Sequence, residues 1–314
     1  MSQDPIRIHL DTDLGSDTDD LCALALLLGW PGVELVGVTT NTDPGGRRAG
    51  FVDHALRLAG RRDVPVAAGA EGTLSELYVP LAFPDYWPEP VPPRPSPPGA
   101  AVELLASSAE SRATIVAIGP YTNLAVLEAV RPGLLRSAGV VVMGGHVTPA
   151  ADGFPPWDFR DDFNVQQDRA AARVVFGRCD PLVVPLAVTA QVTLRASQLP
   201  RLRAAGPLGV LLADQAEAHA RDNGRTELGR AWPGLPDDLL NFQYDPLACA
   251  VAAGWVGVAV EEIPTAVKTR NGLVSMERRE GAPVLRVVTG VDAPRFDEAW
   301  LQAVERASAG AAGR

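Results

Sequence analysis

Positive charge is scarce in this sequence. Among its 314 residues Lys268 is the only lysine, the arginines are scattered, and the formal net charge is −10. Proteins that bind nucleic acids collect positive charge on one face, where it contacts the phosphates. The composition therefore predicts no nucleic-acid partner, whereas an acidic balance suits a solvated surface and the binding of cations.

Cysteine and long apolar runs are also scarce. Cys22, Cys179 and Cys249 are odd in number, far apart and set in apolar surroundings, which is typical of reduced core residues. No apolar run reaches membrane-spanning length. The first residues, MSQDPIRIHL, lead into a strand pattern and do not resemble a signal peptide. We therefore expect a cytoplasmic protein with no membrane partner.

Apolar runs of strand length alternate with segments of helical periodicity. This alternation predicts an α/β fold with an open, mostly parallel, Rossmann-like sheet, flanking helices and a small β-hairpin region near the C-terminus. We expect a single domain over residues 1–314. The expected strands are 6–10, 33–40, 64–68, 114–117, 140–143 and 183–188, with hairpins within 256–291; helices are expected at 21–28 and 48–59, from Thr122, and within 201–243 before a loop-like stretch.

Residues 80–99 are so rich in proline that helix and interior strand are both excluded. A long surface loop is expected there. Loops of this length in a compact domain are commonly lids or binding loops, although a plain surface excursion accounts for the composition equally well.

An acidic loop follows the first expected strand. Residues 11–20 read DTDLGSDTDD and contain Asp11, Asp13, Asp17, Asp19 and Asp20. In open α/β sheets ligands bind at the carboxyl ends of strands, so the loop lies where a site is expected. Carboxylates this close repel one another unless a cation is present, and hard cations such as calcium prefer oxygen ligands. Helix capping explains two of the five, and the spacing is not that of an EF-hand, so we predict a compact metal site.

Together with four later blocks, the acidic loop resembles the nucleoside hydrolases, whose best-known members prefer inosine and uridine. Their DxDxGxDD motif is matched here with two extra residues before the final Asp pair. The later blocks, in the family's order, are AIGPYTNLA at 117–125, VVVMGG at 140–145, DFNVQQD at 162–168 and YDPLA at 244–248. The resemblance spans residues 6–307. It implies calcium-dependent hydrolysis of the N-glycosidic bond of a ribonucleoside, giving ribose and the free base.

The resemblance also implies roles for individual residues. Asp13 would be a metal ligand and the general base that takes a proton from the attacking water. Because of the two extra residues, Asp17 is an alternative both for the second metal ligand and for the ribose contact. The implied metal contacts are Asp13, Asp20 or Asp17, the backbone carbonyl of Ile118, and Asp245; the implied ribose and pocket residues are Asp19, Met143, Asp162 and Asn164.

The part of the pocket that holds the base departs from the family pattern. Tyr244 stands where the family usually has a histidine associated with protonating the leaving base, and a tyrosine donates a proton less readily. The family's ribose-contacting asparagine is replaced or displaced here, which leaves Asn41 and Asp43 as candidate substitutes, and Trp157 lies near the place of a second expected asparagine. Aromatic stacking could then hold the base, and the candidates for it are Tyr86, Trp87, Trp157 and Trp232.

Two other classes of protein compete with a nucleoside hydrolase. Haloacid-dehalogenase phosphohydrolases also carry DxD after a first strand, but they need a partner lysine, and Lys268 lies in hairpin-like sequence near the C-terminus. The alternative is a metal-dependent riboside-binding protein with weak or no turnover. The retained Asp13 argues against it, because a binder needs no general base. For assembly, the resemblance implies a homodimer or homotetramer acting on a small-molecule nucleoside.

Overall fold

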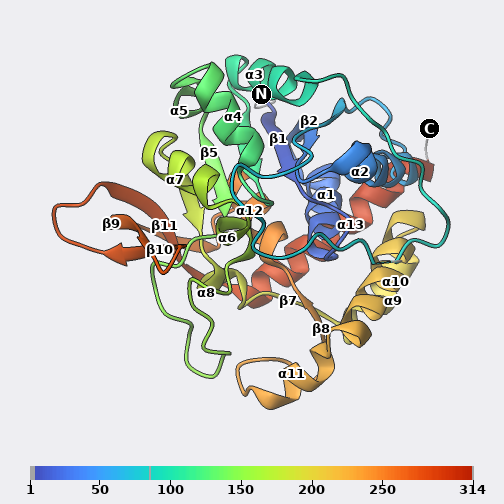
Figure 1. Cartoon of the computed structure of the whole chain (residues 1–314). Coiled ribbons are helices and arrows are strands. Elements are labelled where there is room, and N and C mark those ends of the chain that lie inside the picture. The colour runs from blue at the N-terminus through green and yellow to red at the C-terminus, as the bar shows by residue number, and fades with distance from the viewer. Residues whose placement is uncertain (1–3, 85, 313–314) are drawn as a thin grey trace.

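A nine-stranded sheet organises the part of the chain that the computed structural model describes, residues 4–84 and 86–312 (Figure 1). The strands are β1 (Ile6–Thr12), β2 (Val33–Thr40), β3 (Val66–Ala68), β4 (Thr114–Ala117), β5 (Val140–Met143), β6 (Leu182–Val184), β7 (Thr193–Arg195), β8 (Leu239–Phe242), β9 (Val258–Arg270), β10 (Leu273–Arg278) and β11 (Val284–Val291). Their order in the sheet is β10-β9-β11-β6-β5-β4-β1-β2-β3. The strands from β11 to β3 run parallel, and the β9–β10 hairpin continues the β11 edge antiparallel. β7 and β8 form a separate antiparallel pair.

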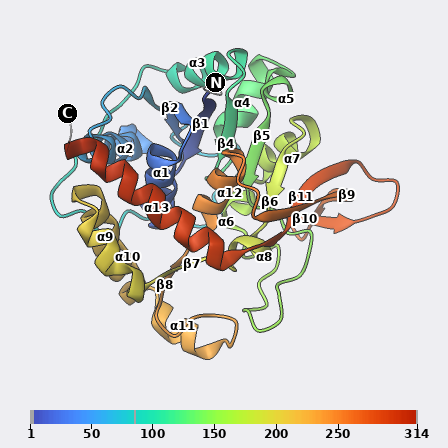
Figure 2. The same ribbon diagram turned by 180° about the vertical axis from the view of Figure 1, so that it is seen from behind.

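Helices cover both faces of this sheet. They are α1 (Asp19–Gly29), α2 (Arg47–Leu58), α3 (Ala100–Glu110), α4 (Thr122–Val130), α5 (Leu134–Ala138), α6 (Phe163–Gln167), α7 (Arg169–Arg178), α8 (Leu186–Thr189), α9 (Leu199–Ala204), α10 (Pro207–Asp222), α11 (Arg225–Ala231), α12 (Tyr244–Ala252) and α13 (Ala293–Ala312), with short 3-10 turns at Pro44–Gly46 and Ala196–Gln198. On one face α1 packs against α12 and α13, and Figure 2 shows α13 crossing that face. On the other face α4 packs against α3 and α7.

Side chains alternate between two apolar cores along the buried strands. In β5, Val141 belongs to the core under α1 and α13, whereas Val140 and Val142 belong to the core under α3, α4 and α7. This alternation is the period of two that a strand imposes. Because both faces are covered, such strands read as continuous apolar runs, which is why the sequence predicts a parallel sheet.

The strand order reverses between β1 and β4. After β1 the chain builds β2 and β3 on one side of it and then returns to place β4 on its other side. In open α/β sheets ligands bind outside the carboxyl ends of the strands at such a switch point. The acidic loop leaves β1 at this place, and Ile118 follows directly on β4.

The predicted α/β fold with its C-terminal hairpin is confirmed, and three predicted strands, 33–40, 114–117 and 140–143, agree residue for residue with β2, β4 and β5. The strand predicted at 183–188 is wrong beyond Val184. Pro185 has no N–H for a strand ladder, so the strand ends there and α8 begins. The loop-like stretch before 243 contains β8, a four-residue strand whose partner β7 lies far away in sequence.

The proline-rich segment 80–99 forms no helix or strand among its described residues, as predicted. It is nevertheless anchored, because Trp87 is buried and stacks on Phe51 of α2 with ring centroids 4.5 Å apart. Cys22, Cys179 and Cys249 are free and buried, as the sequence predicts. Within residues 4–84 and 86–312, no helix combines the length and the apolar character needed to cross a membrane.

Candidate active site

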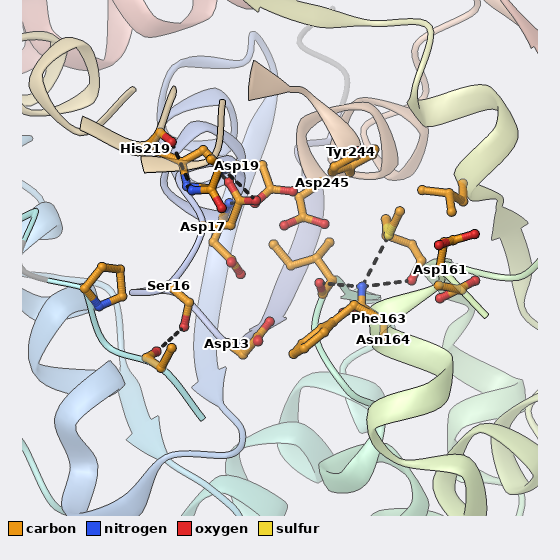
Figure 3. A pocket seen from close by; sticks show the side chains of 18 of the residues that line it. Asp13, Ser16, Asp17, Asp19, Asp161, Phe163, Asn164, His219, Tyr244 and Asp245 are labelled. Atoms are coloured by element: carbon orange, nitrogen blue, oxygen red, sulfur yellow. Dashed lines mark hydrogen bonds and ion pairs between the residues drawn. The ribbon is translucent and has the colours of Figure 1, made fainter. Parts of the chain in front are cut away.

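A cavity of about 790 Å³ opens at the carboxyl ends of β1, β4 and β5 (Figure 3). Asp13 follows β1, Ile118 follows β4 and Met143 ends β5, so the switch point supplies its floor. The structure brings together the candidate metal, ribose and catalytic residues except Asn41 and its alternative Asp43, which is fully buried and bound to Thr40. Those that line the cavity are Asp13, Asp17, Asp19, Asp20, Ile118, Met143, Trp157, Asp162, Asn164, Tyr244 and Asp245.

Three buried carboxylates meet on one wall of the cavity. Asp19 and Asp20 come from the first turn of α1, Asp245 comes from α12, and each offers an oxygen within 4.8 Å of the other two. Burial, followed by repulsion from neighbouring aspartates that include Asp13 and, for Asp19 and Asp20, Asp17, raises the pKa of all three carboxyl groups well above the ordinary value. A hard cation would relieve this repulsion, and carboxylate oxygens are the ligands it prefers. The group could therefore hold a metal ion.

Asp13 lies within electrostatic reach of these carboxylates, because its charge contributes to the raised pKa of each of them. Arg48, which is almost fully buried on α2, donates to the backbone oxygen of Asp13 and lies 4.0 Å from its carboxylate. A Cβ on Gly119 would lie 2.5 Å from the Asp13 Oδ1 atom. Only glycine leaves room for this carboxylate, so the loop after β4 and α2 together fix where Asp13 stands.

A buried network supports the acidic loop from behind. Asp11 accepts hydrogen bonds from the amides of Asn41 and Asn123, at 3.0 and 2.8 Å, and from the hydroxyl of Thr39. Burial raises the pKa of Asp11 to about 6, although these three hydrogen bonds oppose the shift. Asn41 is fully buried in this network and is not among the residues that line the cavity. The structure thus places Asn41 behind the acidic loop, outside the set of residues that line the cavity.

Polar groups from α6 form one end of the cavity. The Asn164 amide donates to the carbonyl of Ile118 at 2.8 Å and to that of Met143 at 3.2 Å. Asp162 caps α6 by accepting from the Val165 N–H and also accepts from the Gly145 N–H. Burial raises the pKa of Asp162 to about 6. A carboxylate and an amide thus stand fixed at this end, and both line the cavity.

Asp17 lies beside Asp19 of the carboxylate group, but its side chain also contacts residues of α10, α11 and β8. Its Oδ2 lies 3.4 Å from His219 Nε2 and 3.8 Å from Arg225 Nη2, and its Oδ1 accepts from the Asn241 amide at 2.5 Å. Burial tends to raise the pKa of Asp17, but the charges of His219 and Arg225 and the Asn241 hydrogen bond together lower it below the ordinary value. Figure 3 shows Asp17 and His219 at one end of the cavity, with Asn164 at the other.

An aromatic cluster forms a further wall. Phe242 stacks on Tyr244 with centroids 5.1 Å apart and meets Trp157 edge-on at 5.2 Å. Of the four aromatic residues expected to stack on a base, Tyr86 and Trp157 line the cavity. The expectation is wrong for Trp87 and Trp232, neither of which lines the cavity. Trp87 stacks on Phe51, and Trp232 packs against the apolar cluster of Leu235 and Phe242, so both rings are used in apolar packing.

The proline-rich segment covers part of the cavity. Ala82, Phe83, Pro84 and Tyr86 line it, and the Ser16 hydroxyl donates to the Ala82 carbonyl at 2.8 Å. Phe83 also lies under two guanidinium groups, those of Arg47 at 4.6 Å and Arg48 at 4.8 Å from its ring centre. Cation–π contacts of this kind hold the segment against the acidic loop. Of the two alternatives for residues 80–99, the structure shows a loop that lines the cavity.

The part of the cavity made by α10 and α11 was not predicted from the sequence. His219 and Arg225 line it and contact Asp17, yet they belong to no motif and lie about 200 residues after the acidic loop. In the sequence, the two residues are marked only by their short separation near the expected end of a helix, and such a pair of basic residues is too common to indicate a site.

The parallel sheet and the acidic cavity at its switch point define the chain as a doubly wound α/β protein with a pocket able to hold a metal ion. Residues 8–298 match the family model described as inosine-uridine preferring nucleoside hydrolase. The chain is also 34% identical over 280 residues to the pyrimidine-specific ribonucleoside hydrolase RihA of Salmonella schwarzengrund (strain CVM19633), covering 82% of this chain and 85% of that protein.

The chain therefore belongs to the inosine-uridine preferring nucleoside hydrolase family, and it is a nucleoside ribohydrolase that cleaves a ribonucleoside N-glycosidic bond. Solved structures show the same fold. The plant nucleoside hydrolase PpNRh1 matches with a TM-score of 0.75 and 21% identity, and the purine-preferring ribonucleoside hydrolase from Gardnerella vaginalis with 0.74 and 22%. Each comparison covers 96% of this chain and 99% of the other.

Proposed function

We propose that the chain hydrolyses its ribonucleoside with calcium as the cofactor, in a base pocket where Tyr244 replaces the family's usual histidine. The observation that carries this proposal is the meeting of Asp19, Asp20 and Asp245 in one buried group, with Asp13 within electrostatic reach. Family membership supplies the reaction class, and the oxygen-rich, buried donor set favours a hard divalent cation.

Asp13, Asp20, Asp245 and the carbonyl of Ile118 would hold the calcium ion. We favour Asp20 over Asp17, because Asp20 faces Asp245 whereas Asp17 is occupied by partners from α10 and α11. When bound, calcium would offset the repulsion among the carboxylates and make a neighbouring water molecule more acidic.

Asp13 would then act as the general base. It takes a proton from water while the water oxygen forms a bond to the ribose C1′ and the bond from C1′ to the base nitrogen breaks. The electron pair of the broken bond leaves with the base. Positive charge develops on the sugar in the oxocarbenium-like transition state, so the surrounding carboxylates stabilise it more than the ground state.

The ribose would lie between the carboxylate group and α6. Asp19, Asp162 and Asn164 supply carboxylate and amide groups for its hydroxyls, and Met143 lines the floor beside them. Asn41 would act from behind, through Asp11, and would hold the acidic loop in place. Polar groups buried in such a pocket are costly when unpaired, which favours a hydroxyl-rich ligand.

The base would lie against Trp157 and Tyr244. Burial raises the pKa of the Tyr244 hydroxyl well above its ordinary value. The hydroxyl therefore stays protonated near neutral pH, and we propose that it serves as a hydrogen-bond donor to the base. Aromatic stacking on Trp157 would add to its binding.

The wider setting of the enzyme forms part of the proposal. The acidic composition favours a small-molecule nucleoside over a nucleic acid as partner. We propose that the protein acts in the cytoplasm, away from membranes, as a homodimer or homotetramer, with residues 1–314 forming one domain.

Ribose release from a panel of ribonucleosides tests the proposed reaction. With calcium present we expect release from at least one of adenosine, guanosine, cytidine, inosine and uridine, with inosine or uridine poorer than the preferred substrate. The 2′-deoxy form of the preferred substrate is the matched control, and we expect it to lose at least about 100-fold in kcat/KM, because its missing hydroxyl leaves buried groups unpaired. Equally full activity on inosine and uridine would contradict the altered base pocket.

A further inference from the structure

The end of the cavity formed by Asp17, α10 and α11 has no role in the reaction described above. This end borders the carboxylate group at Asp17, whose Oδ1 lies 3.4 Å from the Asp19 backbone nitrogen, and it lies across the cavity from Asn164 (Figure 3). Four residues that converge there, Asp17, His219, Arg225 and Asn241, come from the acidic loop, α10, α11 and β8. These residues come from both ends of the chain and meet at one end of the cavity, so the arrangement depends on the tertiary fold and not on one surface helix.

Arg225 is the cation of this site. Its side chain is 17% exposed, it lines the cavity, and its Nη2 atom lies 3.8 Å from the Asp17 carboxylate. Its Nε atom is buried and has no hydrogen-bond partner among the residues that the structure describes. A buried N–H without a partner is costly, and an acceptor on a bound ligand would satisfy it.

The aromatic wall places this cation beside the proposed position of the base. The Arg225 guanidinium lies 5.4 Å from the centre of the Phe242 ring, and Phe242 also contacts Tyr244 and Trp157. Because all three residues gather on one ring and all three line the cavity, Arg225 stands at the edge of the surface on which a base would stack.

We propose that Arg225 binds and activates the leaving base, and that Asp17 is the residue that positions it. This inference rests on the proposed hydrolysis. As the C1′–N bond breaks, its electron pair moves onto the base, and the guanidinium donates hydrogen bonds to ring nitrogens or carbonyl oxygens that become more negative. Arg225 keeps its own protons; the base gains one from solvent, while Asp13 returns to solvent the proton it took from water. The ligand class is a heteroaromatic base with acceptor atoms on the edge away from the sugar.

His219 and Asn241 complete the support for Asp17. His219 Nε2 lies 3.4 Å from Asp17 Oδ2 and 3.3 Å from Arg225 Nη2, so the ring contacts both members of the pair. Asn241 holds the other oxygen of Asp17. Asn241 and His219 thus hold the carboxylate that faces the guanidinium, and the extra acid in this loop gains a role distinct from metal binding.

The test compares Arg225→Met with wild type on two substrates. We expect kcat/KM for the preferred nucleoside to fall by about 100-fold, the effect of removing one donor aimed at developing negative charge. The loss of kcat/KM on p-nitrophenyl riboside should be at least tenfold smaller, because p-nitrophenolate leaves as a stable anion and needs no hydrogen bond from the protein. Arg230→Gln, an exposed arginine on the same helix, is the matched control and should change neither value. Equal losses on both substrates, or no loss on either, would overturn the proposal.

Three further measurements guard against misfolding and against failure of the proposed function. Arg225→Lys keeps the positive charge but lacks the planar, two-pronged guanidinium, so it should be more active than Arg225→Met and less active than wild type. Asp17→Asn should reduce nucleoside turnover, and the double variant should lose less than the sum of the single losses, because one residue acts through the other. Calorimetric titration with adenine, hypoxanthine and uracil should show at least one base binding to wild type about tenfold more tightly than to Arg225→Met. That titration needs no turnover. If the enzyme were inactive on all nucleosides but Arg225 still strengthened base binding, the proposed hydrolysis would be contradicted and this site would not. Equal base binding in wild type and Arg225→Met would contradict the site.

Discussion

Replacing Asp13 by asparagine is expected to lower kcat by about 1,000-fold, which lies within the usual contribution of a general base. The substitution keeps the size of the side chain, so the space left by Gly119 and the backbone contact with Arg48 remain. An amide cannot accept the proton from water, and turnover stops at that step. The measurement is steady-state ribose release at saturating calcium, with riboside binding followed by calorimetry.

Substitution of the exposed Asp152 by asparagine is the control for Asp13→Asn and should leave kcat within about twofold, as expected for a surface change away from the site. If Asp13→Asn kept more than about a tenth of the wild-type kcat, another group would have to be the base. The assignment of Asp13 would then fail even though the site still binds ribosides.

Removing calcium is expected to abolish activity and to lower the melting temperature. Without a cation, Asp19, Asp20 and Asp245 stand buried within 4.8 Å of one another, and repulsion among their charged forms destabilises the fold. Calcium at 100 times its Kd should add about 2.7 kcal/mol to the free energy of unfolding, which corresponds to roughly 5 °C for a protein of this size. Dialysis against a chelator followed by calorimetry and ribose release measures both effects.

Metal exchange separates calcium from other cations. Magnesium requires a tighter octahedral arrangement at shorter distances and gives up its water less readily, so we expect it to restore less than about a tenth of the activity. A double variant, Asp20→Asn with Asp245→Asn, should lose the calcium-dependent shift in melting temperature. Full activity after exhaustive chelation, with no metal retained by the protein, would contradict a calcium enzyme.

The sequence predicts the parts of this site that local patterns determine. The acidic loop directly follows an apolar strand, and Ile118 and Met143 stand at the ends of two further strands. The carboxyl ends of parallel strands meet at one edge of a sheet, so these residues had to converge. Asp245 is found through the YDPLA block, and the first turn of α12 carries it to Asp19 and Asp20.

The remaining parts depend on contacts between distant segments, which leave no local pattern. Whether Asp17 joins the carboxylate group or turns toward α10 is decided by His219 and Arg225, about 200 residues later. The presence of an aromatic residue in the sequence also does not determine whether its ring faces the cavity or the core. Trp157 lines the cavity, whereas Trp87 stacks on Phe51 in the hydrophobic core.

Release of p-nitrophenol from p-nitrophenyl riboside tests the proposed chemistry most directly, because its leaving group needs no protonation and the outcome depends on the ribose and metal parts of the site alone. We predict that wild type releases p-nitrophenol with calcium present, that a chelator stops the release, and that Asp13→Asn shows almost none. If wild type released no p-nitrophenol while calcium and the riboside were both bound, calcium-dependent hydrolysis at this site would be contradicted, and the chain would be a riboside-binding protein.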